Sequence, residues 1–373
     1  MRVAFFQPYL ANWRIGFLSA FIEQNSHDVI VYDGGFKQKD DPKSLSGHDA
    51  NFSITRLWNA SWVFKYKNQD YPLYFSPFLF FRLIKDRPDR IITEGEINFL
   101  NNISIFLYCF LFRKKFIWWS LGKVRDRKPN ALTRFFEPII NFLIKRSSCV
   151  LARNTLAKTY YLDCKNVNED KIILAPNSMN TRLVLDDLEY PAPNFSIEGR
   201  IILYVGSLIK SKRPLDLLYA FKIMRAERES QDVFLWFVGA GPELEQLQEV
   251  TKQLELEKSV NFYGAIFNGV GHYFKRADVV VVPGMGGLVI HHATLLGKPV
   301  VSRVADGTEY DLIHEGKNGY ILNDYSNHNL AEAITKVLDN QNYHEMCQYS
   351  LNLTKNHWNS SIMIDRVNQA LMK

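Results

Sequence analysis

The chain has 373 residues, too many for one ordinary core and suited to two domains of roughly 150–200 residues each. It is 47% hydrophobic and 23% charged, the composition of a globular protein, which excludes a disordered chain. Its four cysteines form no CxxC pair and no metal-like spacing with histidine. They are therefore expected to be buried free thiols in a reducing cytoplasm.

The net charge of +6 hides an asymmetry between the two halves. Residues 1–185 carry 27 Lys and Arg against 16 Asp and Glu, whereas the remainder carries 18 against 23. A basic half suits nucleic acid, an anionic membrane surface or a phosphorylated substrate. Because no nucleic-acid recognition motif accompanies the charge, we expect no nucleic-acid partner.

The first half begins with a strand over residues 2–10, a helix over 13–24 and a strand over 27–35. Since the chain starts as a strand, no signal peptide is expected. Further strand and helix signals follow, with strands at 89–96, 114–122, 148–154 and 171–180 and helices at 97–112, 131–146 and 155–163. The apolar stretch 99–112 has 14 residues, fewer than the ~20 that a membrane span needs, so it is expected to be a core helix.

The predicted helix 131–146 is amphipathic and basic. Phe135, Ile139 and Leu143 recur at helical spacing, with Arg134 and Arg146 among them. This face suits an interfacial helix that lies on anionic lipid, and equally an ordinary amphipathic helix packed on its own domain.

Residues 186–199 have two prolines, acidic side chains and no periodicity, which indicates a linker. The pattern then restarts, with strands at 200–208, 233–241, 259–266, 278–284 and 298–304 and helices at 214–228, 242–255, 270–276, 287–296, 328–339 and 342–370. We therefore predict an N-terminal domain at 1–185 and a C-terminal domain at 200–354. The last helix, from about 355 to 373, is expected to pack back on the N-terminal domain.

Strands that alternate with helices predict an α/β fold with two doubly wound, Rossmann-like domains. Ligands of such sheets bind beyond the carboxyl ends of the strands, here expected in the cleft between the domains. Strand-end loops in the second half contain Gly206 and Ser207, Gly239, Gly264, and three glycines from Gly284 to Gly287. Glycines before a helix let bare amides approach an anion, and Lys212 offers a countercharge, so the loops predict a diphosphate site.

The same loops resemble those of glycosyltransferase family 4, the retaining GT-B enzymes that use nucleotide-sugars. The resemblance covers residues 145–340 and rests on "KIILAPNSMN", "YVGSLIKSKRP", "VGAGPE", "VNFYGAI", "ADVVVVPG", "GMGGLVIHHATLLGKPVV" and "HEGKNGYIL". It implies a GT-B fold and a nucleoside-diphosphate-sugar donor. The donor residues that it implies are Gly206, Ser207, Lys212, Gly239, Tyr263, Gly264, Ala265, Gly284, Met285, Gly286, Gly287, Leu288 and His292, with Lys212 on the phosphates and Tyr263, Gly264 and Ala265 at the nucleobase.

The sequence departs from the family at three positions. The two family glutamates fall on Gly284 and His292, and the arginine after the first strand falls on Ser207. The sugar must then be bound by backbone groups such as those of Met285. An imidazole at His292 can bind a ribose hydroxyl, the alternative being a satisfied core histidine, which is what we expect of His291.

Acceptor residues are expected in the loops that follow the N-terminal strands, although surface-loop or helix-capping roles are the alternative for each. Arg14 or Lys123 would steady the leaving phosphate, and Glu94 or Glu96 would orient the acceptor hydroxyl. Lys212, His292, Arg14 and Glu94 are the predicted catalytic residues. The predicted acceptor residues are Tyr9, Asn12, Trp13, Trp119, Lys123 and Asn177.

A subgroup of the family from bacterial O-antigen and capsule pathways has a similar "PGxxGLxxxHA" pattern and lacks the glutamates. The resemblance implies a retaining glycosyltransferase of hexosyl or related type in surface polysaccharide or lipopolysaccharide biosynthesis. A glycan or lipid-linked acceptor, a cytoplasmic or peripheral location at the inner membrane face, and no metal or other cofactor are expected, because amides and Lys212 can replace a metal. The alternatives are a non-hydrolysing nucleotide-sugar epimerase of the same fold and a catalytically inactive nucleotide-sugar-binding protein.

Overall fold

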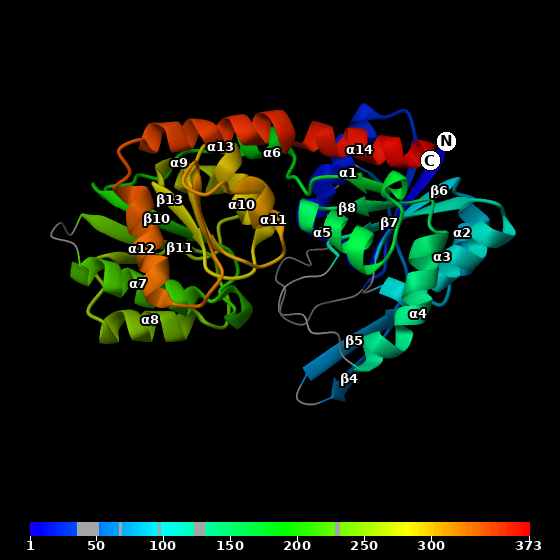
Figure 1. Cartoon of the computed structure of the whole chain (residues 1–373), viewed down its shortest axis with the longest axis horizontal. Helices are drawn as coiled ribbons and strands as arrows, with labels where there is room; N and C mark the ends of the chain where they lie inside the picture. Colours follow the sequence, from blue (N-terminus) through cyan, green and yellow to red (C-terminus); the bar gives the residue numbers. More distant parts are fainter. Residues whose placement is uncertain (36–51, 67–68, 96–97, 123–130, 228–231) are drawn as a thin grey trace. The chain divides into compact units, whose positions relative to one another are not determined.

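The computed structural model describes residues 1–35, 52–66, 69–95, 98–122, 131–227 and 232–373. The chain divides into two units, each built around its own parallel sheet (Figure 1). Within these ranges, the first unit comprises residues 1–35, 52–66, 69–95, 98–122, 131–176 and 360–373, and the second comprises 177–227 and 232–359. The expected alternation of strands and helices is confirmed in both, with sheets of 7 and 6 strands.

The first unit contains β1 Arg2–Gln7, α1 Asn12–Gln24, β2 Asp28–Asp33, β3 Ile54–Arg56, β4 Ala60–Tyr66, β5 Gln69–Phe75, α2 Leu79–Asp86, β6 Arg90–Glu94, α3 Phe99–Leu111, β7 Lys115–Ser120, α4 Ala131–Arg146, β8 Cys149–Ala152, α5 Thr155–Thr159, β9 Ile172–Leu174 and α14 Ser360–Met372. Its parallel sheet has the order β3-β2-β1-β6-β7-β8-β9. The antiparallel pair β4 and β5 stands apart from that sheet, and the sequence analysis did not find it.

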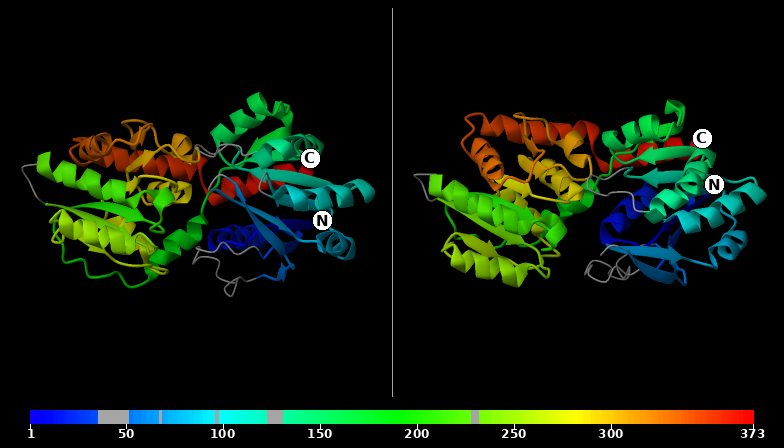
Figure 2. Two further views of the ribbon diagram at one scale, coloured as in Figure 1. Left: turned by 90° about the horizontal axis from the view of Figure 1, so that it is seen from below. Right: turned by 60° about the horizontal axis from the view of Figure 1, so that its bottom comes forward.

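Both faces of this sheet are buried, which explains why its central strands are continuous apolar runs such as Phe116–Trp119. Side chains on one face pack against α2, α3, α4 and α5, and those on the other pack against α1 and α14. Figure 2 shows helices on both sides of the sheet. Helix α14 joins this unit through Met363, Val367 and Leu371, although it is the last helix of the chain.

The second unit contains α6 Thr181–Asp186, β10 Arg200–Val205, α7 Pro214–Glu227, β11 Val233–Val238, α8 Leu244–Gln253, β12 Val260–Phe262, α9 Val270–Arg276, β13 Val279–Val282, α10 Gly287–Leu295, β14 Val300–Arg303, α11 Thr308–Leu312, β15 Gly319–Leu322, α12 Asn327–Leu338 and α13 Tyr343–His357. Its sheet is wholly parallel and has the order β12-β11-β10-β13-β14-β15.

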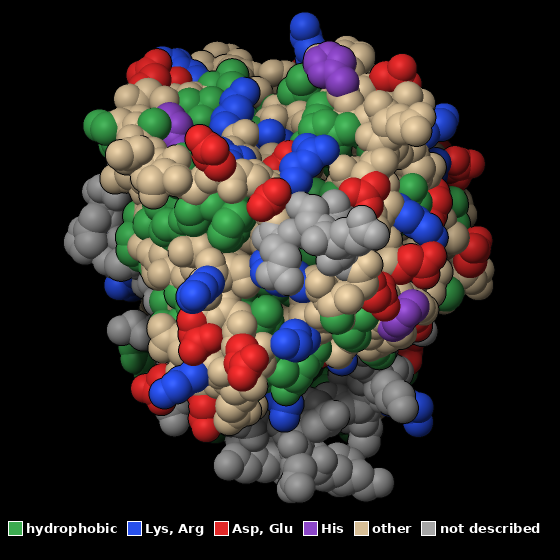
Figure 3. All heavy atoms as spheres, turned by 90° about the vertical axis from the view of Figure 1, so that its left-hand side faces the viewer, with side chains coloured by type: hydrophobic (Ala, Val, Ile, Leu, Met, Phe, Trp, Pro, Cys, Tyr) green, Lys and Arg blue, Asp and Glu red, His purple; other side chains and the backbone are tan. Residues whose placement is uncertain are grey.

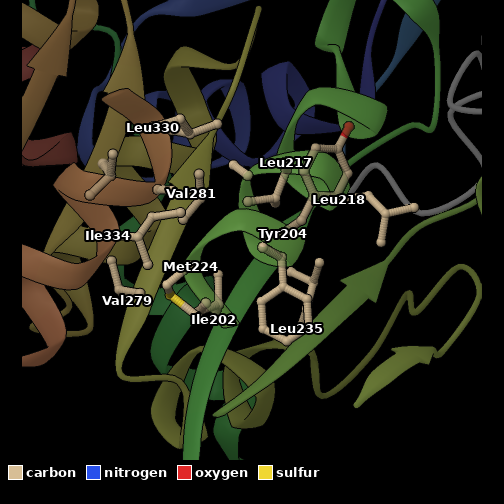
Figure 4. Close-up of a cluster of buried hydrophobic side chains, with 14 of the residues drawn as sticks. Ile202, Tyr204, Leu217, Leu218, Met224, Leu235, Val279, Val281, Leu330 and Ile334 are labelled. Atoms are coloured by element: carbon tan, nitrogen blue, oxygen red, sulfur yellow. The ribbon is translucent and has the colours of Figure 1, made fainter. Parts of the chain in front are cut away.

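Alternate strand residues of this sheet enter two separate cores. Ile202, Tyr204 and Leu235 face α7, α8 and α12, where they pack with Leu217 and Ile334 (Figure 4). The opposite face packs against α9, α10 and α11. Because all its strands are parallel, their carboxyl ends lie at one edge of the sheet.

The C-terminal region differs from the single helix expected over 342–370. Helix α13 ends at His357, Trp358 has φ −134° and ψ 62°, and α14 begins at Ser360. The carbonyl oxygen of Trp358 accepts a hydrogen bond from Nε2 of His291, with a distance of 2.6 Å between the two atoms. The break therefore carries a tertiary contact that helical periodicity does not reveal.

Candidate functional site

The second unit has a topological switch point at β10. This strand lies between β11 and β13, so the chain leaves it toward one side of the sheet and returns on the other. Open parallel sheets bind ligands beyond the carboxyl ends of the strands at such a point. The segments that follow β10 and β13 here are the two that contain Lys212 and Gly284–Leu288.

Lys212 lies against the backbone of the loop that follows β10. Gly206 has φ +146°, and a Cβ built on it would lie 2.8 Å from Nζ of Lys212. Lys212 ends a short 3-10 turn, after which Arg213 has φ +54° and turns the chain into α7. The turn therefore places an ammonium group beside the carboxyl end of β10.

Gly284 lies against the same turn. A Cβ at this position would lie 2.6 Å from the carbonyl oxygen of Ser211 and 2.9 Å from Cα of Lys212. The amide of the next residue, Met285, donates to the same Ser211 oxygen, at 3.4 Å. No side chain fits at position 284 without moving the Lys212 backbone, so glycine is a packing requirement here. Of the backbone groups expected to bind the sugar, the N–H of Met285 thus already has an acceptor within the protein.

Helix α10 begins with three amides that have no acceptor among the described residues. The N–H groups of Gly286, Gly287 and Leu288 donate no hydrogen bond to any residue that the structure describes, and the first bond of the helix runs from Val289 to the Gly286 carbonyl. The helix dipole adds about half a positive charge at this end. Together with Lys212, these amides form a site that suits a phosphate or diphosphate group.

The predicted nucleobase residues follow β12. Tyr263 is half-buried in an aromatic cluster with Trp236 and Tyr273, at ring-centroid distances of 5.1 and 4.9 Å. Gly264 has φ +69°, and no atom of the described residues lies within 4 Å of a Cβ built there. Its carbonyl oxygen accepts from the amide of Gly239 at 2.7 Å, which ties the loops after β11 and β12 together. Ala265 is exposed.

The two histidines of α10 have different environments. His291 is fully buried, accepts from the Met179 amide through Nδ1 and donates to Trp358 through Nε2. His292 is 7% exposed and stacks on Phe274 at 4.1 Å, and its Nε2 has no partner in the described chain. Burial lowers the pKa of His291 to about 4 and, with a smaller effect of His291, that of His292 to about 3. Both rings are neutral at physiological pH.

In the first unit, a buried charge cluster forms at the carboxyl edge of the sheet. Glu94 ends β6, Arg153 follows β8, and Arg14 lies in α1 after β1. One oxygen of Glu94, Oε1, accepts from Nη2 of Arg14 at 3.1 Å and from Nη2 of Arg153. The exposed fraction of the side chain is 1% for Arg14, 8% for Arg153 and 23% for Glu94.

The arginines keep this carboxylate ionised. Burial by itself would raise the pKa of Glu94, but the charges of Arg153 and Arg14 outweigh it and hold the pKa below its ordinary value. Burial and the neighbouring Arg153 lower the pKa of Arg14 to about 9, so the group is still protonated at neutral pH. Glu94 is therefore suited to accept a hydrogen bond from a hydroxyl group and unsuited to act as a proton-accepting base.

Trp119 does not have the exposed position that an acceptor-stacking residue needs. Its ring is fully buried and supports the guanidinium of Arg14 at 4.1 Å and that of Arg153 at 5.3 Å. The prediction of an acceptor contact for Trp119 is thus wrong, because β7 is covered on both faces. Tyr9 and Asn177 are half-buried. Lys123, Glu96 and the side chains of Asn12 and Trp13 lie outside the described residues.

Three polar residues at the strand ends were missed by the sequence analysis. Arg153 directly follows β8, and Asp306 and Thr308 follow β14. Asp306 and Thr308 lie beside Gly287 at the start of α10. Their signal was the same one that identified Gly206 and Gly264, namely a position just beyond the carboxyl end of a predicted strand.

Comparison with known proteins finds similarity over the second unit. Residues 189–351 match the profile of the family described as "Glycosyl transferases group 1". Among curated relatives, the lipopolysaccharide core biosynthesis glycosyltransferase LpsD of Rhizobium meliloti is 30% identical over 156 residues, 41% of this chain and 42% of LpsD. An uncharacterized glycosyltransferase of Methanocaldococcus jannaschii is 25% identical over 277 residues, 71% of this chain and 69% of that protein.

The chain thus spans less than half the length of LpsD.

Among solved structures, Anabaena HepE in complex with UDP superposes with a TM-score of 0.75 at 17% identity, covering 100% of both chains. This likeness and the two parallel sheets confirm the predicted α/β fold with two doubly wound domains of GT-B type.

Proposed function

We propose that this protein is a retaining glycosyltransferase that moves a hexose or related sugar from a nucleoside-diphosphate-sugar to a glycan or lipid-linked acceptor. The observation that carries the proposal is the set of amides at Gly286–Leu288 that have no acceptor among the described residues, with Lys212 held by the neighbouring turn. Such a pair of features binds the leaving diphosphate and stabilises the negative charge that develops on it. The comparisons support the proposal, since LpsD is a glycosyltransferase and HepE binds UDP.

We place the reaction in bacterial surface polysaccharide biosynthesis, of the O-antigen, capsule or lipopolysaccharide kind. In support, the curated relative LpsD functions in lipopolysaccharide core biosynthesis. The first unit would bind the acceptor, with Glu94 held ionised by Arg14 and Arg153 to receive its hydroxyl. Amides and Lys212 would serve in place of a metal ion, so that transfer proceeds equally with and without a chelator.

A panel of UDP-, GDP-, dTDP- and ADP-sugars tests the reaction class. Calorimetry measures binding of each compound, and NMR of the products after incubation with candidate acceptors distinguishes transfer from epimer formation. Transfer of a sugar with retained anomeric configuration supports the proposal. An epimerised nucleotide-sugar without transfer would identify the epimerase that shares this fold. Binding without turnover would identify an inactive binding protein, and absence of binding throughout the panel would remove the donor site.

We also propose that the first unit binds anionic membrane surfaces through α3 and α4. The two helices meet through the rings of Phe106 and Phe142, 5.2 Å apart. Helix α3 is not the fully buried core helix that was expected, because Leu107, Phe110 and Leu111 are 44%, 68% and 61% exposed. On α4, Phe135 is 76% exposed. None of the described helices is long and apolar enough to cross a membrane.

Basic groups lie next to one of these apolar side chains, Phe110. A cavity of about 330 Å³ between the helices and the start of β7 is lined by Phe106, Cys109, Phe110, Lys114, Lys115, Phe116, Arg146, Ser148, Lys171 and Lys373. Apolar contact with acyl chains combined with cationic contact to headgroups is the pattern of peripheral membrane binding. By contrast, the face of the molecule drawn in Figure 3 carries acidic and basic side chains interspersed.

Flotation with phosphatidylglycerol and phosphatidylcholine vesicles tests the membrane surface. We expect binding to the anionic vesicles that weakens at high salt. Replacement of Phe110 and Phe135 by serine should abolish it, whereas Phe267→Ser, a change at a residue that is 69% exposed on the second unit, should not. Equal flotation of all three proteins would contradict the assignment of this surface.

A further inference from the structure

A second set of polar groups faces the start of α10. A Cβ built on Gly287 would lie 2.6 Å from Oδ2 and 2.9 Å from Oδ1 of Asp306, and 2.8 Å from Oγ1 of Thr308. These three oxygens therefore lie close to Cα of Gly287. The adjoining amides of Gly286, Gly287 and Leu288 are the ones without acceptors in the described structure.

The loop that presents Asp306 and Thr308 is fixed from within. Glu309 is fully buried, and its carboxylate accepts from the amide of Ala305 at 2.8 Å and from that of Gly307 at 3.0 Å. Oδ1 of Asp306 accepts from the Thr308 amide, also at 3.0 Å. The positions of the Asp306 and Thr308 side chains are thus set by the β14 to α11 connection before any ligand arrives.

Thr308 has an unmet hydrogen-bonding group. Thr308 is only 3% exposed, and its hydroxyl has no partner among the described residues. Buried hydroxyls are nearly always hydrogen-bonded in native proteins, so one without a partner beside open amides points to a ligand.

The chemistry of this pair selects the ligand group. A carboxylate repels a phosphate. A nucleotide-sugar whose diphosphate lies on the α10 amides would therefore direct an uncharged part, its sugar, toward Asp306. Sugar hydroxyls donate well to a carboxylate and exchange hydrogen bonds with a threonine hydroxyl. Position 284 has no room for an acidic side chain, because the Lys212 turn fills that space. Asp306 brings a carboxylate to the same helix end from the neighbouring strand.

We propose that Asp306 and Thr308 bind hydroxyl groups of the sugar in the nucleotide-sugar donor. The assignment rests on the proposed function, because it takes the diphosphate site at α10 as given. It makes the β14 to α11 connection the part of the protein that distinguishes a sugar-bearing donor from the bare nucleoside diphosphate.

The test compares a nucleoside diphosphate with its sugar derivative, starting with UDP and UDP-glucose and using the pair that binds in the donor panel. Asp306→Asn keeps an oxygen acceptor for the Thr308 amide, so the loop is retained. We expect it to weaken nucleotide-sugar binding by about tenfold or more, as for loss of a charge-assisted hydrogen bond, and to leave binding of the bare nucleotide unchanged or tighter. Asp339→Asn, an exposed change beyond α12, serves as the matched control.

Thr308 is tested with two variants. Thr308→Val removes the hydroxyl at nearly constant volume and should weaken the nucleotide-sugar selectively, whereas Thr308→Ser should restore binding. Thermal denaturation confirms that each variant is folded. Equal affinity loss for both ligands, or no loss for either, would overturn the proposal.

Two other results have separate meanings. If the affinity of Asp306→Asn for the bare nucleotide falls only when Mg²⁺ is present, Asp306 binds a cation and the sugar assignment is wrong. If wild-type protein binds neither member of any pair, the donor site itself is refuted and the sugar assignment falls with it.

Discussion

Nε2 of His291 donates a hydrogen bond to the carbonyl oxygen of Trp358 at 2.6 Å, which ties α10 to the break between α13 and α14. Nδ1 accepts from the Met179 amide at the same time, and this second bond requires a neutral imidazole. Burial keeps the ring in that form by lowering its pKa from the ordinary 6.5 to about 4.

The histidine pair predicts a specific pH dependence of stability. Well above pH 6.5 both histidines are neutral in the folded and unfolded chains. Neither then lowers the free energy of unfolding through protonation. As the pH falls toward 4, the unfolded chain takes up protons that the folded chain excludes. The free energy of unfolding should therefore fall by up to about 1.4 kcal/mol per pH unit for each histidine. Urea unfolding at stepped pH measures this slope.

The variant His292→Phe serves as the reference for that slope. Phenylalanine retains stacking on Phe274 and removes one titrating group, so the pH dependence between 6 and 4 should become shallower than in the wild type. Identical slopes for the two proteins would show that His292 does not titrate with folding.

The same substitution tests the contact of His292 with the nucleotide. Nε2 has no partner in the described chain, and a ribose hydroxyl would supply one. We expect His292→Phe to weaken nucleoside diphosphate binding by about 1 kcal/mol, the net contribution of one neutral hydrogen bond. Calorimetry at pH 7 measures the change. An affinity equal to that of the wild type would show that His292 packs in the core and does not contact the nucleotide.

Lys212 should be the main cationic contact of the diphosphate. Lys212→Ala should weaken nucleotide binding by about 1.5–3 kcal/mol, and the remaining affinity should depend less on salt. Lys210→Ala is the matched control, because Lys210 belongs to the same short turn but is exposed. Equal effects of the two changes would indicate long-range charge in place of direct contact.

Gly284 should not tolerate a side chain. Gly284→Ala would push its Cβ into the Ser211 carbonyl and the Lys212 backbone, so we expect a loss of about 1–3 kcal/mol in stability together with weaker nucleotide binding. Thermal unfolding and calorimetry measure the two effects. A variant with wild-type stability and affinity would mean that the turn moves freely and does not position Lys212.

Glu94 should stabilise the first unit as well as orient the acceptor. Glu94→Gln leaves two buried guanidinium groups without a carboxylate, and we expect the free energy of unfolding to fall by roughly 3 kcal/mol. In the wild type, the lowered pKa of Glu94 implies that its contribution is present above pH 4.5 and is lost as the pH falls through the lower folded value.

A comparison of Arg153→Lys with Arg153→Met separates charge from geometry in this cluster. The lysine variant keeps the positive charge and should retain more stability than the methionine variant. If both variants are as stable as the wild type, the pairing of Arg153 with Glu94 does not contribute to folding.

The sequence by itself determined the alternation of strands and helices and the loops of the second unit that form the candidate donor site. These features are local. Runs such as Val279–Val282 favour a buried strand, and glycine before a helix leaves amides open wherever that helix packs. The boundaries of α9 and α10 were therefore predicted to within about one residue.

The tertiary structure decided which side chains meet at the strand ends. Arg153 contacts Glu94 across 59 positions, and Asp306 and Thr308 face Gly287, because of the order in which strands lie in each sheet. Hydrophobic periodicity indicates that strand ends share an edge but not which ends are neighbours. Trp119 is likewise covered by α1, and the carbonyl oxygen of Trp358 is bound by His291 of α10, both elements distant in sequence.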